Sequence, residues 1–305
     1  MGELLRLGTR KSPLALAQSQ MFADALAAHY EGLEVELVPI VTRGDREPGE
    51  LAKIGGKGLF TQELEQGLLG GELDLAVHSL KDLPVTMPDG LVVAAFPERE
   101  DARDGLVSLQ GTELDDLPSG AVLLTGSQRR RSQILARRDD LTVESIRGNV
   151  DTRLRKWREQ AAGGVILAMS GLRRLGLVEE VPVHALDPEV MIPAPGQGIL
   201  AIEVKAGGRA EELVSALDHP ASARAAVAER HVVASLGGDC TLPLAAWAAE
   251  DDDEVLHLRA CLATPDGHRM ARGEGRASDP VEAAERCLEA LHAAGAEAVL
   301  GALGR

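Results

Sequence analysis

Residues Leu73–Asp82 read LDLAVHSLKD, a stretch that changes from mainly apolar to mainly polar residues after Val77. The mainly apolar segment Leu73–Val77 predicts a short buried strand, which is followed at its carboxyl end by His78, Ser79, Lys81 and Asp82. In open α/β sheets, ligands bind outside the carboxyl ends of strands, so a basic residue beside an acidic one here indicates proton chemistry on a bound anion. The alternative is a capped helix start, in which Ser79 or Asp82 accepts hydrogen bonds from free backbone N–H groups. Taken alone, the stretch favours this alternative.

Strand, turn and helix also alternate before this stretch, which is typical of an α/β sheet. A strand at 4–7 ends in the turn 8–11, and Ser12 as N-cap with Pro13 at the first helical position begins a helix that runs to about His29. Further strands are expected at 35–41 and 91–96, and a helix is expected at 61–69. The turn 8–11 carries Thr and Arg before a helix start, and this combination suits an anion.

Arginine follows three successive strands in the middle of the chain. The expected strands are 121–124, 142–146 and 165–168, and each leads through a polar turn into a helix. The basic residues after them are Arg129, Arg130 and Arg131, then Arg147 and Arg153, then Arg173 and Arg174. Solvated helix faces also carry arginine, but they have no reason to concentrate it at strand ends. The pattern therefore favours binding of carboxylates or phosphates at this edge.

The charge of the chain is uneven. The 305 residues carry a net charge of −16, which disfavours nucleic acid or an anionic membrane as a partner. Between Gly126 and Arg174, however, twelve Lys and Arg stand against five Asp and Glu, a local charge of +7 that leaves −23 elsewhere. This distribution indicates one site for an anionic ligand.

The composition indicates a globular cytoplasmic protein. Apolar residues make up 45% of the chain, no run of 18 apolar residues is present, and Met1–Arg6 lacks the pattern of a secretion signal. The three cysteines, Cys240, Cys261 and Cys287, are too few and too scattered for a disulfide framework or a zinc site. No metal is therefore expected.

Two segments predict crossings between domains. Pro97–Asp104 is a charged crossover, Ile192–Gly198 is a hinge by composition, and a strand at 199–204 could return to the first domain. Helices at 211–217 and 221–236, antiparallel strands at 242–249, 255–263 and 268–273, and a long helix from Pro280 to about Leu300 predict a small α+β domain. The expected fold class is α/β, with domain 1 at 1–98 and 199–216, domain 2 at 99–198 and domain 3 at 217–305.

The segment Lys53–Phe60, KIGGKGLF, predicts a mobile loop. It resembles a phosphate-binding loop only superficially, because the spacing and the Lys-Ser/Thr ending of that motif are absent. With Lys53, Lys57 and its glycines, the segment is suited to folding over a charged ligand.

Eight motifs together resemble the porphobilinogen deaminase (hydroxymethylbilane synthase) family over essentially the whole chain. Each is weak alone, but eight in this order and spacing are highly specific. They are Arg6–Arg10 with Ser12, Leu14, Ala15 and Gln18; Thr42–Asp45; Gly55–Phe60; Val77–Asp82; Gln128–Arg130; Arg147–Val150; Pro195–Gly198; and Gly237–Cys240.

The resemblance implies a three-domain monomer whose first two domains are lobes like those of type-2 periplasmic binding proteins. It implies a transferase of tetrapyrrole (haem) biosynthesis, which joins four porphobilinogen molecules head to tail and releases ammonia each time. Water then releases hydroxymethylbilane (preuroporphyrinogen), which passes to a uroporphyrinogen-forming enzyme. The growing chain is held on a dipyrromethane cofactor, made from the enzyme's own substrate and attached to a cysteine as a thioether.

The resemblance also assigns residues, position by position. Asp82 is the expected catalytic carboxylate, since it can stabilise the cation left by loss of ammonia and can move protons. Cys240, in a flexible glycine loop, is the expected attachment cysteine, while Cys261 and Cys287 are expected to be small buried hydrophobes. The expected cofactor-binding residues are Lys81, Asp82, Ser127, Arg129, Arg130, Arg147 and Gly171. The expected substrate-binding residues are Arg10, Ser12, Gln18, Ser79, Thr125, Arg153, Arg174 and Gln197, and those of the mobile loop are Lys53, Lys57 and Phe60.

The chain departs from the family pattern beside the cysteine. The family often has a glycine where Asp239 stands. A carboxylate beside a thiol disfavours the thiolate, which would slow attachment of the cofactor.

Two other classes of function compete with the enzyme. A non-catalytic anion-binding protein could use the same two lobes, but it would not explain Cys240 in its glycine loop or Asp82 at a strand end. A phosphate-transfer enzyme that uses Gly55–Gly58 is disfavoured by the missing Lys-Ser/Thr.

Overall fold

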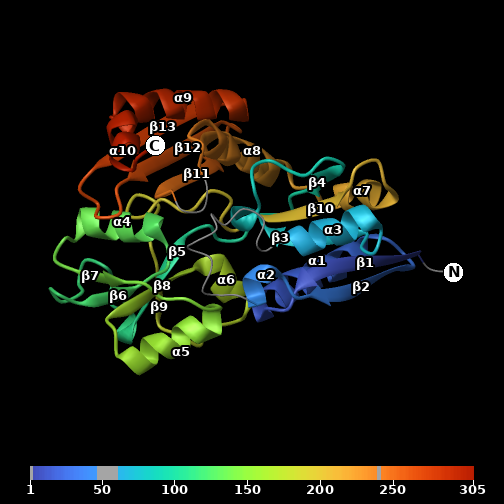
Figure 1. Ribbon diagram of the computed structural model, residues 1–305, viewed down its shortest axis with the longest axis horizontal. Coiled ribbons are helices and arrows are strands. Elements are labelled where there is room, and N and C mark those ends of the chain that lie inside the picture. The colour runs from blue at the N-terminus through green and yellow to red at the C-terminus, as the bar shows by residue number, and fades with distance from the viewer. Residues whose placement is uncertain (1–2, 47–60, 239–241) are drawn as a thin grey trace. The chain divides into compact units, whose positions relative to one another are not determined.

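The computed structural model describes residues 3–46, 61–238 and 242–305 (Figure 1). The chain forms two compact units, Met1–Arg99 with Ile199–Ala223 and Glu100–Gly198 with Arg224–Arg305. The second unit holds both an α/β lobe and the C-terminal sheet, so the division into three domains with the boundaries given above stays a prediction.

One five-stranded sheet forms the described part of the first unit, in the order β2-β1-β3-β10-β4. Strands β1, β2 and β3 run parallel, whereas β10 is antiparallel to both of its neighbours. The strands are β1 Glu3–Arg10, β2 Leu33–Ile40, β3 Leu75–Ser79, β4 Leu91–Ala95 and β10 Leu200–Lys205. The helices are α1 Pro13–His29, α2 Arg43–Arg46, α3 Gln62–Gly70 and α7 Arg209–Val214, with 3-10 turns at Leu80–Asp82 and Ser215–Leu217.

Alternation of side chains along the strands gives this sheet two covered faces. Leu5, Leu7 and Val77 point to one face and pack with Phe22 and Leu26 of α1. Ala76 belongs to the other face, in a second cluster with residues of α3, namely Leu64 and Leu68. Since successive residues of a strand point to opposite faces, a mainly parallel sheet covered by helices on both sides needs nearly continuous apolar strands. Within β3, the consecutive residues Leu75, Ala76 and Val77 have that character, and all three are buried.

The second unit contains a lobe with the same strand order. Its sheet runs β7-β6-β8-β5-β9, in which β6, β7 and β8 are parallel and β5 is antiparallel to its neighbours. The strands are β5 Asp104–Ser108, β6 Val122–Leu124, β7 Thr142–Glu144, β8 Gly164–Ala168 and β9 Val183–Ala185. The helices are α4 Gln128–Arg137, α5 Val150–Gln160 and α6 Met169–Arg174, with a 3-10 turn at Leu109–Gly111. The predicted fold class of two like α/β lobes with a C-terminal α+β part is confirmed.

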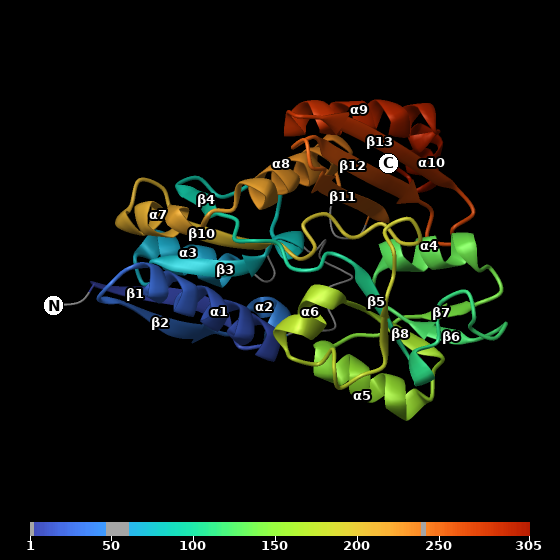
Figure 2. The same ribbon diagram turned by 180° about the vertical axis from the view of Figure 1, so that it is seen from behind.

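Helices α4 and α5 cover opposite faces of this second sheet (Figures 1 and 2). Ile134 of α4 packs with Leu106 and Ile166, whereas Trp157 of α5 packs with Val107 and other residues of the opposite face. Helix α4 begins four residues after the end of β6, and its first residues include the predicted Arg129 and Arg130.

The C-terminal part of the second unit is an antiparallel sheet in the order β11-β12-β13, with α9 lying across it (Figure 1). Its elements are β11 Leu244–Glu250, β12 Leu256–Ala263, β13 Met270–Ala277, α9 Pro280–Ala293 and α10 Ala296–Ala302, and α8 Pro220–Ser235 leads into this part from the last residues of the first unit. The predicted long helix is broken at Gly295, whose φ of 95° lies in the left-handed region that ends helices. No helix in residues 3–46, 61–238 and 242–305 is both long and apolar enough to cross a membrane.

Two glycines on one face of β13 let α9 approach the sheet closely. A Cβ on Gly273 would lie 2.5 Å from the carbonyl oxygen of Cys287, and one on Gly275 would overlap the carbonyl oxygen of Ala283. Because both obstacles are helix backbone, no side chain can turn aside to make room.

We predict that Gly275→Ala destabilises the protein by about 1–3 kcal/mol, the usual range for overpacking a well-packed core. Urea denaturation followed by circular dichroism measures this as a lower midpoint. Gly301→Ala, in α10, is the control and should be neutral or slightly stabilising, because no atom beyond its chain neighbours and its own helix backbone lies within 4 Å of the added carbon. Equal midpoints for the two variants would contradict the close approach of α9.

Candidate functional site

Asp82 lies on the single turn of 3-10 helix that follows β3, on the first unit. The turn is anchored by Leu80, which is 2% exposed and whose N–H donates to the carbonyl oxygen of Ile199 at 3.0 Å. This anchoring leaves Asp82 exposed and Lys81 half-buried. The capped-helix alternative is wrong for Ser79, because its side chain makes no capping bond to this turn.

Ser79 is instead bound to α1. The side-chain amide of Gln18, a residue 5% exposed, donates to Ser79 Oγ at 3.0 Å. Register places Arg10 at the same edge, since β1 pairs in parallel with β3 through Gly8 and Ala76. Four of the predicted residues on this unit, Arg10, Gln18, Ser79 and Asp82, thus share one edge of the sheet.

Ser12 acts as the predicted helix cap. Its Oγ accepts a hydrogen bond from the N–H of Ala15 at 3.2 Å, so the N-terminus of α1 begins directly beyond Arg10. The prediction that Ser12 binds substrate is not tested by this bond, because the hydroxyl keeps its own hydrogen to donate.

His78 is buried and paired with a residue that the sequence did not single out. Its Nε2 lies 2.8 Å from Oε2 of Glu203 on β10, and the two side chains are 5% and 0% exposed. The register pairs His78 with Ala201 of β10. Glu203 lies two residues further along β10 and therefore points to the same face of the sheet as Ala201. A lone acidic residue inside the apolar run 199–204 is the signal that could have identified it. His78 therefore ties β3 to β10.

On the second unit, Arg129 and Arg130 converge on Asp104 at the start of β5. Asp104 is 0% exposed and each arginine is 5% exposed. Arg129 Nη1 donates to Asp104 Oδ2 at 2.7 Å, and Arg130 Nε donates to Oδ1 at 2.9 Å. Burial alone would raise the pKa of the Asp104 carboxyl, but the two guanidinium charges outweigh it and hold that pKa well below its ordinary value.

Gln197 belongs to the same buried network. Its amide nitrogen donates to Asp104 Oδ1 at 2.9 Å and to the carbonyl oxygen of Ala102 at 2.7 Å. The residue is 1% exposed. The motifs imply a substrate-binding role for Gln197, whereas the sequence identifies Asp104 only as the end of a charged crossover and gives no sign that this carboxylate is the centre of the network.

The remaining predicted residues of the second unit lie at the carboxyl ends of β6, β7 and β8. Thr125 is buried and accepts from the N–H of Ser127 at 3.2 Å, and Ser127 caps α4. Arg147 is exposed, whereas Arg153 is half-buried and donates from Nε to the carbonyl oxygen of Gly148 at 2.7 Å. Because parallel strands end at one edge, these side chains lie on a common edge of the sheet.

Helix α6 carries Gly171 and Arg174 after β8. Gly171 is buried, and Arg174 donates from Nη2 to the carbonyl oxygen of Gly198 at 2.7 Å. Burial lowers the pKa of Arg174 to about 10, which still leaves it charged at neutral pH. Arg137 and Arg173 are exposed, and they pair with Asp115 and Asp101, respectively.

Five residues of interest lie outside the described residues: Cys240, Asp239, Lys53, Lys57 and Phe60. The other two cysteines are buried as expected, at 1% exposure for Cys261 and 0% for Cys287.

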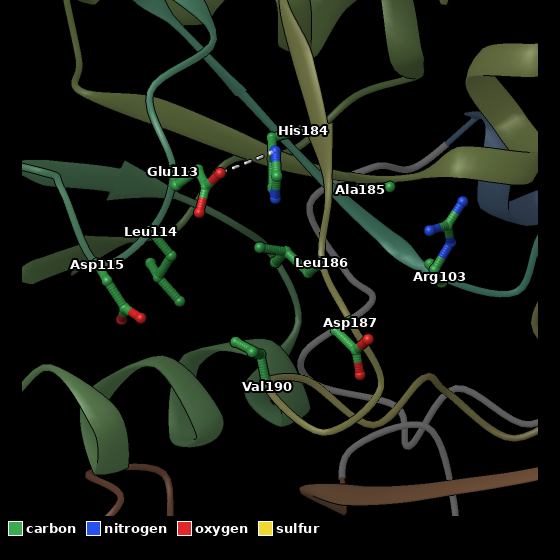
Figure 3. A pocket seen from close by; sticks show the side chains of 9 residues that line it. All are labelled: Arg103, Glu113, Leu114, Asp115, His184, Ala185, Leu186, Asp187 and Val190. Carbon is green, nitrogen blue, oxygen red and sulfur yellow. Dashed lines mark ion pairs between the residues drawn. The ribbon is translucent and has the colours of Figure 1, made fainter.

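A cavity of about 300 Å³ in the second unit does not coincide with the predicted site (Figure 3). Its lining consists of Arg103, Glu113, Leu114, Asp115, His184, Ala185, Leu186, Asp187 and Val190. Charged groups there already have partners, such as Asp115 with Arg137 and Arg103 with Asp101. We therefore assign it no role in the chemistry.

These features define an α/β protein of two like lobes, the second of which presents basic residues at its strand ends. Comparison with known proteins narrows this class. The model of the "porphobilinogen deaminase, dipyromethane cofactor binding domain" matches residues 5–212, and that of the "porphobilinogen deaminase, C-terminal domain" matches residues 223–293.

Full-length relatives agree with the family models. The chain is 47% identical over 303 residues to a porphobilinogen deaminase of Rubrobacter xylanophilus, covering 99% of this chain and 98% of that protein. It is also 47% identical over 306 residues to one of Roseiflexus castenholzii, covering 98% and 99%. The chain belongs to the porphobilinogen deaminase family.

Solved structures give lower similarity. The methionine-binding protein MetQ overlaps with a TM-score of 0.44 at 11% identity, covering 70% of this chain and 89% of that one. The periplasmic aliphatic sulphonate binding protein SsuA from Escherichia coli overlaps with a TM-score of 0.39 at 16% identity, covering 77% and 75%.

We predict that neither Cys261 nor Cys287 reacts with iodoacetamide in the native protein at pH 8. Burial raises the pKa of these thiols to about 11 and about 12, so at most about one part in a thousand of either is the reactive thiolate. Peptide mass mapping after alkylation checks this, with urea-unfolded protein as the control in which both should react. Native labelling of either cysteine would contradict its burial.

Proposed function

We propose that this protein is a hydroxymethylbilane synthase, which condenses four porphobilinogen molecules head to tail with release of ammonia and then releases hydroxymethylbilane. The observation that carries the proposal is the buried cluster of Asp104, Arg129 and Arg130 inside the family's cofactor-binding domain. Two guanidiniums share one carboxylate there, so the cluster keeps a net charge of +1. A transferase that binds a chain of pyrroles with carboxylate side chains requires positive charge of this kind, because guanidinium groups bind carboxylates.

The residues present fit a dipyrromethane cofactor. Each pyrrole carries an acetate and a propionate, and Arg129 Nε is a buried donor with no hydrogen-bond partner in the described part of the chain. Side chains or backbone of Ser127, Arg129, Arg130, Arg147 and Gly171 would hold it, together with Lys81 and Asp82. When bound, the cofactor supplies the pyrrole carbon to which the next unit is joined.

Asp82 is the proposed catalytic residue. Loss of ammonia from porphobilinogen leaves a positive charge that is shared with the ring N–H. A carboxylate held on a short anchored turn can stabilise this charge and can take up or return a proton at the pyrrole nitrogen. Lys81 is the basic residue beside it, and we assign it to a substrate carboxylate.

The other basic residues bind and orient the lengthening polyanion. Arg10, Arg153 and Arg174 supply charge, while Ser12, Gln18, Ser79, Thr125 and Gln197 are proposed to support the substrate. Gln197 is buried and donates to Asp104 and to the carbonyl oxygen of Ala102, so we propose that it supports the substrate indirectly, through these groups. Lys53, Lys57 and Phe60 are proposed to form the loop over the bound chain.

Several finer features belong to the same proposal. Cys240 is the proposed attachment point, through a thioether. We further propose a cytoplasmic monomer that needs no metal, nucleic acid or membrane and that passes its product to a uroporphyrinogen-forming enzyme. The rival interpretation as a non-catalytic anion-binding protein lacks a use for Cys240.

The purified protein should have an intact mass above that of its sequence by two linked pyrrole units, localised to the Cys240 peptide. Protein at its sequence mass should gain this increment on incubation with porphobilinogen. Cys240→Ala is the control that should never gain it. If the unmodified chain stays at its sequence mass in the presence of porphobilinogen, the proposed function is wrong.

We expect Asp82→Asn to keep the shape of the turn but to lower the rate of hydroxymethylbilane formation by about 10²–10⁴-fold, since the amide can neither carry the charge nor accept the proton. Thermal unfolding should be nearly unchanged, because Asp82 is exposed. Asp89→Asn, an exposed carboxylate seven residues further on in sequence number, is the matched control and should retain activity. Near-normal turnover of Asp82→Asn would exclude the assignment.

A further inference from the structure

Asp104 makes hydrogen bonds to three side chains from two distant parts of the chain. Its Oδ1 accepts from Arg130 Nε and Gln197 Nε2, each at 2.9 Å, and its Oδ2 accepts from Arg129 Nη1 at 2.7 Å. Arg130 Nη2 also lies 2.7 Å from Oδ1. One carboxylate on β5 thereby determines where two consecutive arginines of α4 place their guanidiniums.

Backbone carbonyls complete the restraint on both arginines. Arg129 Nη1 donates a second hydrogen bond, to the carbonyl oxygen of Ile192 at 2.7 Å, and Arg130 Nη1 donates to that of Ile166 at 2.9 Å. The side-chain amide of Gln133 holds the backbone of Ile192 in turn: its Nε2 donates to the carbonyl oxygen of Ile192, and its Oε1 accepts from the N–H of Ile192. The guanidiniums are therefore held from β5, β8 and the segment before Gln197, not by α4 alone.

This arrangement is unfavourable for stability taken by itself. The first turn of α4 contains no acidic residue, and its arginines lie where the helix dipole is positive. One carboxylate leaves one of the two buried positive charges unbalanced. Apolar side chains of similar volume often replace buried ion pairs with no loss of stability, so packing does not account for the cluster.

The donors of Arg129 are also used unevenly. Its hydrogen bonds to Asp104 and to the carbonyl oxygen of Ile192 both come from Nη1, and Nε has no hydrogen-bond partner within the described ranges. Nε and the adjacent amino group form the edge with which arginine binds a carboxylate in a bidentate manner. Asp104 occupies the opposite side of the guanidinium and so turns this edge away from itself.

We propose that Asp104 is a positioning residue for the cofactor: it orients Arg129 and Arg130 so that their single uncompensated charge receives one carboxylate of the dipyrromethane. The inference rests on the proposed function. Asp104 acts through the arginines and touches no ligand itself. Binding of one carboxylate makes the cluster electrically neutral.

The Asp104→Asn variant distinguishes a positioning role of Asp104 from a purely electrostatic role. The substitution removes a negative charge, so a purely electrostatic role predicts uptake of the cofactor at least as fast as in the unchanged protein. Loss of positioning predicts the opposite, because the amide replaces an acceptor by a donor that faces a guanidinium. A purely structural role predicts a lower unfolding temperature with unchanged uptake per folded chain.

The experiment incubates each protein, prepared without cofactor, with porphobilinogen at a temperature at which circular dichroism shows it folded. Intact mass then follows the gain of two pyrrole units with time. We expect the rate constant of Asp104→Asn to fall on the order of 10²-fold, as for a reacting group held out of place. Uptake by Asp104→Asn equal to or faster than that of the unchanged chain would overturn the inference.

Asp101→Asn is the matched control. Asp101 is three residues earlier, its side chain is 9% exposed, and it pairs with two arginines, Arg103 and Arg173, that have no proposed role in binding. It should lose stability but acquire the cofactor at the unchanged rate, and slow uptake by this variant as well would count against a specific role for Asp104.

A second substitution covers the case in which Asp104→Asn does not fold. Gln197→Leu removes one donor to Asp104 and keeps the charges, so uptake should slow less than in Asp104→Asn but measurably, and unchanged uptake would overturn the inference. If the unchanged chain itself gains no mass from porphobilinogen, the proposed function is wrong. If the unchanged chain and the variant gain mass at the same rate, only the inference about Asp104 is wrong.

Discussion

The contact between Asp104 and two adjacent arginines is the interaction on which the charged edge of the second unit depends. It joins β5 to the first turn of α4 and to Gln197, three places far apart in the sequence. Removing one member of a buried, hydrogen-bonded charge group leaves a charge without a partner and costs about 3–5 kcal/mol. Ser127, Arg147 and Arg153 follow strands of the same sheet and so lie at the same edge as this cluster.

In the first unit, the buried polar pair and the residue with the proposed chemical role are separate, and the latter is exposed. Its buried polar pair, His78 with Glu203, stays inside and joins β3 to the antiparallel β10. The polar groups with proposed chemical roles come immediately afterwards, on a turn pinned by Leu80, and the carboxylate of Asp82 is exposed. Burial of one polar residue and exposure of another four positions later follow from a strand that ends between them. His78 is thus a structural residue of the sheet in this arrangement.

Local pattern was enough to predict much of the fold. Apolar runs of strand length, the Ser12-Pro13 helix start and the polar residues after each strand gave the two α/β lobes and the edge of each at which the candidate residues lie. The helix expected from Pro280 to Leu300 was wrong at Gly295, because an alanine-rich helical pattern hides a single left-handed glycine. The same spacing rules could not distinguish exposed Arg147 from buried Arg129, since both simply follow a strand.

The sequence by itself determined the family, the order of the elements and the residue types at each strand end, because motifs and periodicity are properties of neighbouring residues. Only the tertiary structure decided which arginines are buried and which remain exposed. Asp104 lies 25 residues before Arg129 and 93 before Gln197, and no local signal relates them. Their association depends on β5 running antiparallel beside β8, which brings the start of one strand to the end of the other and buries the carboxylate among the arginines.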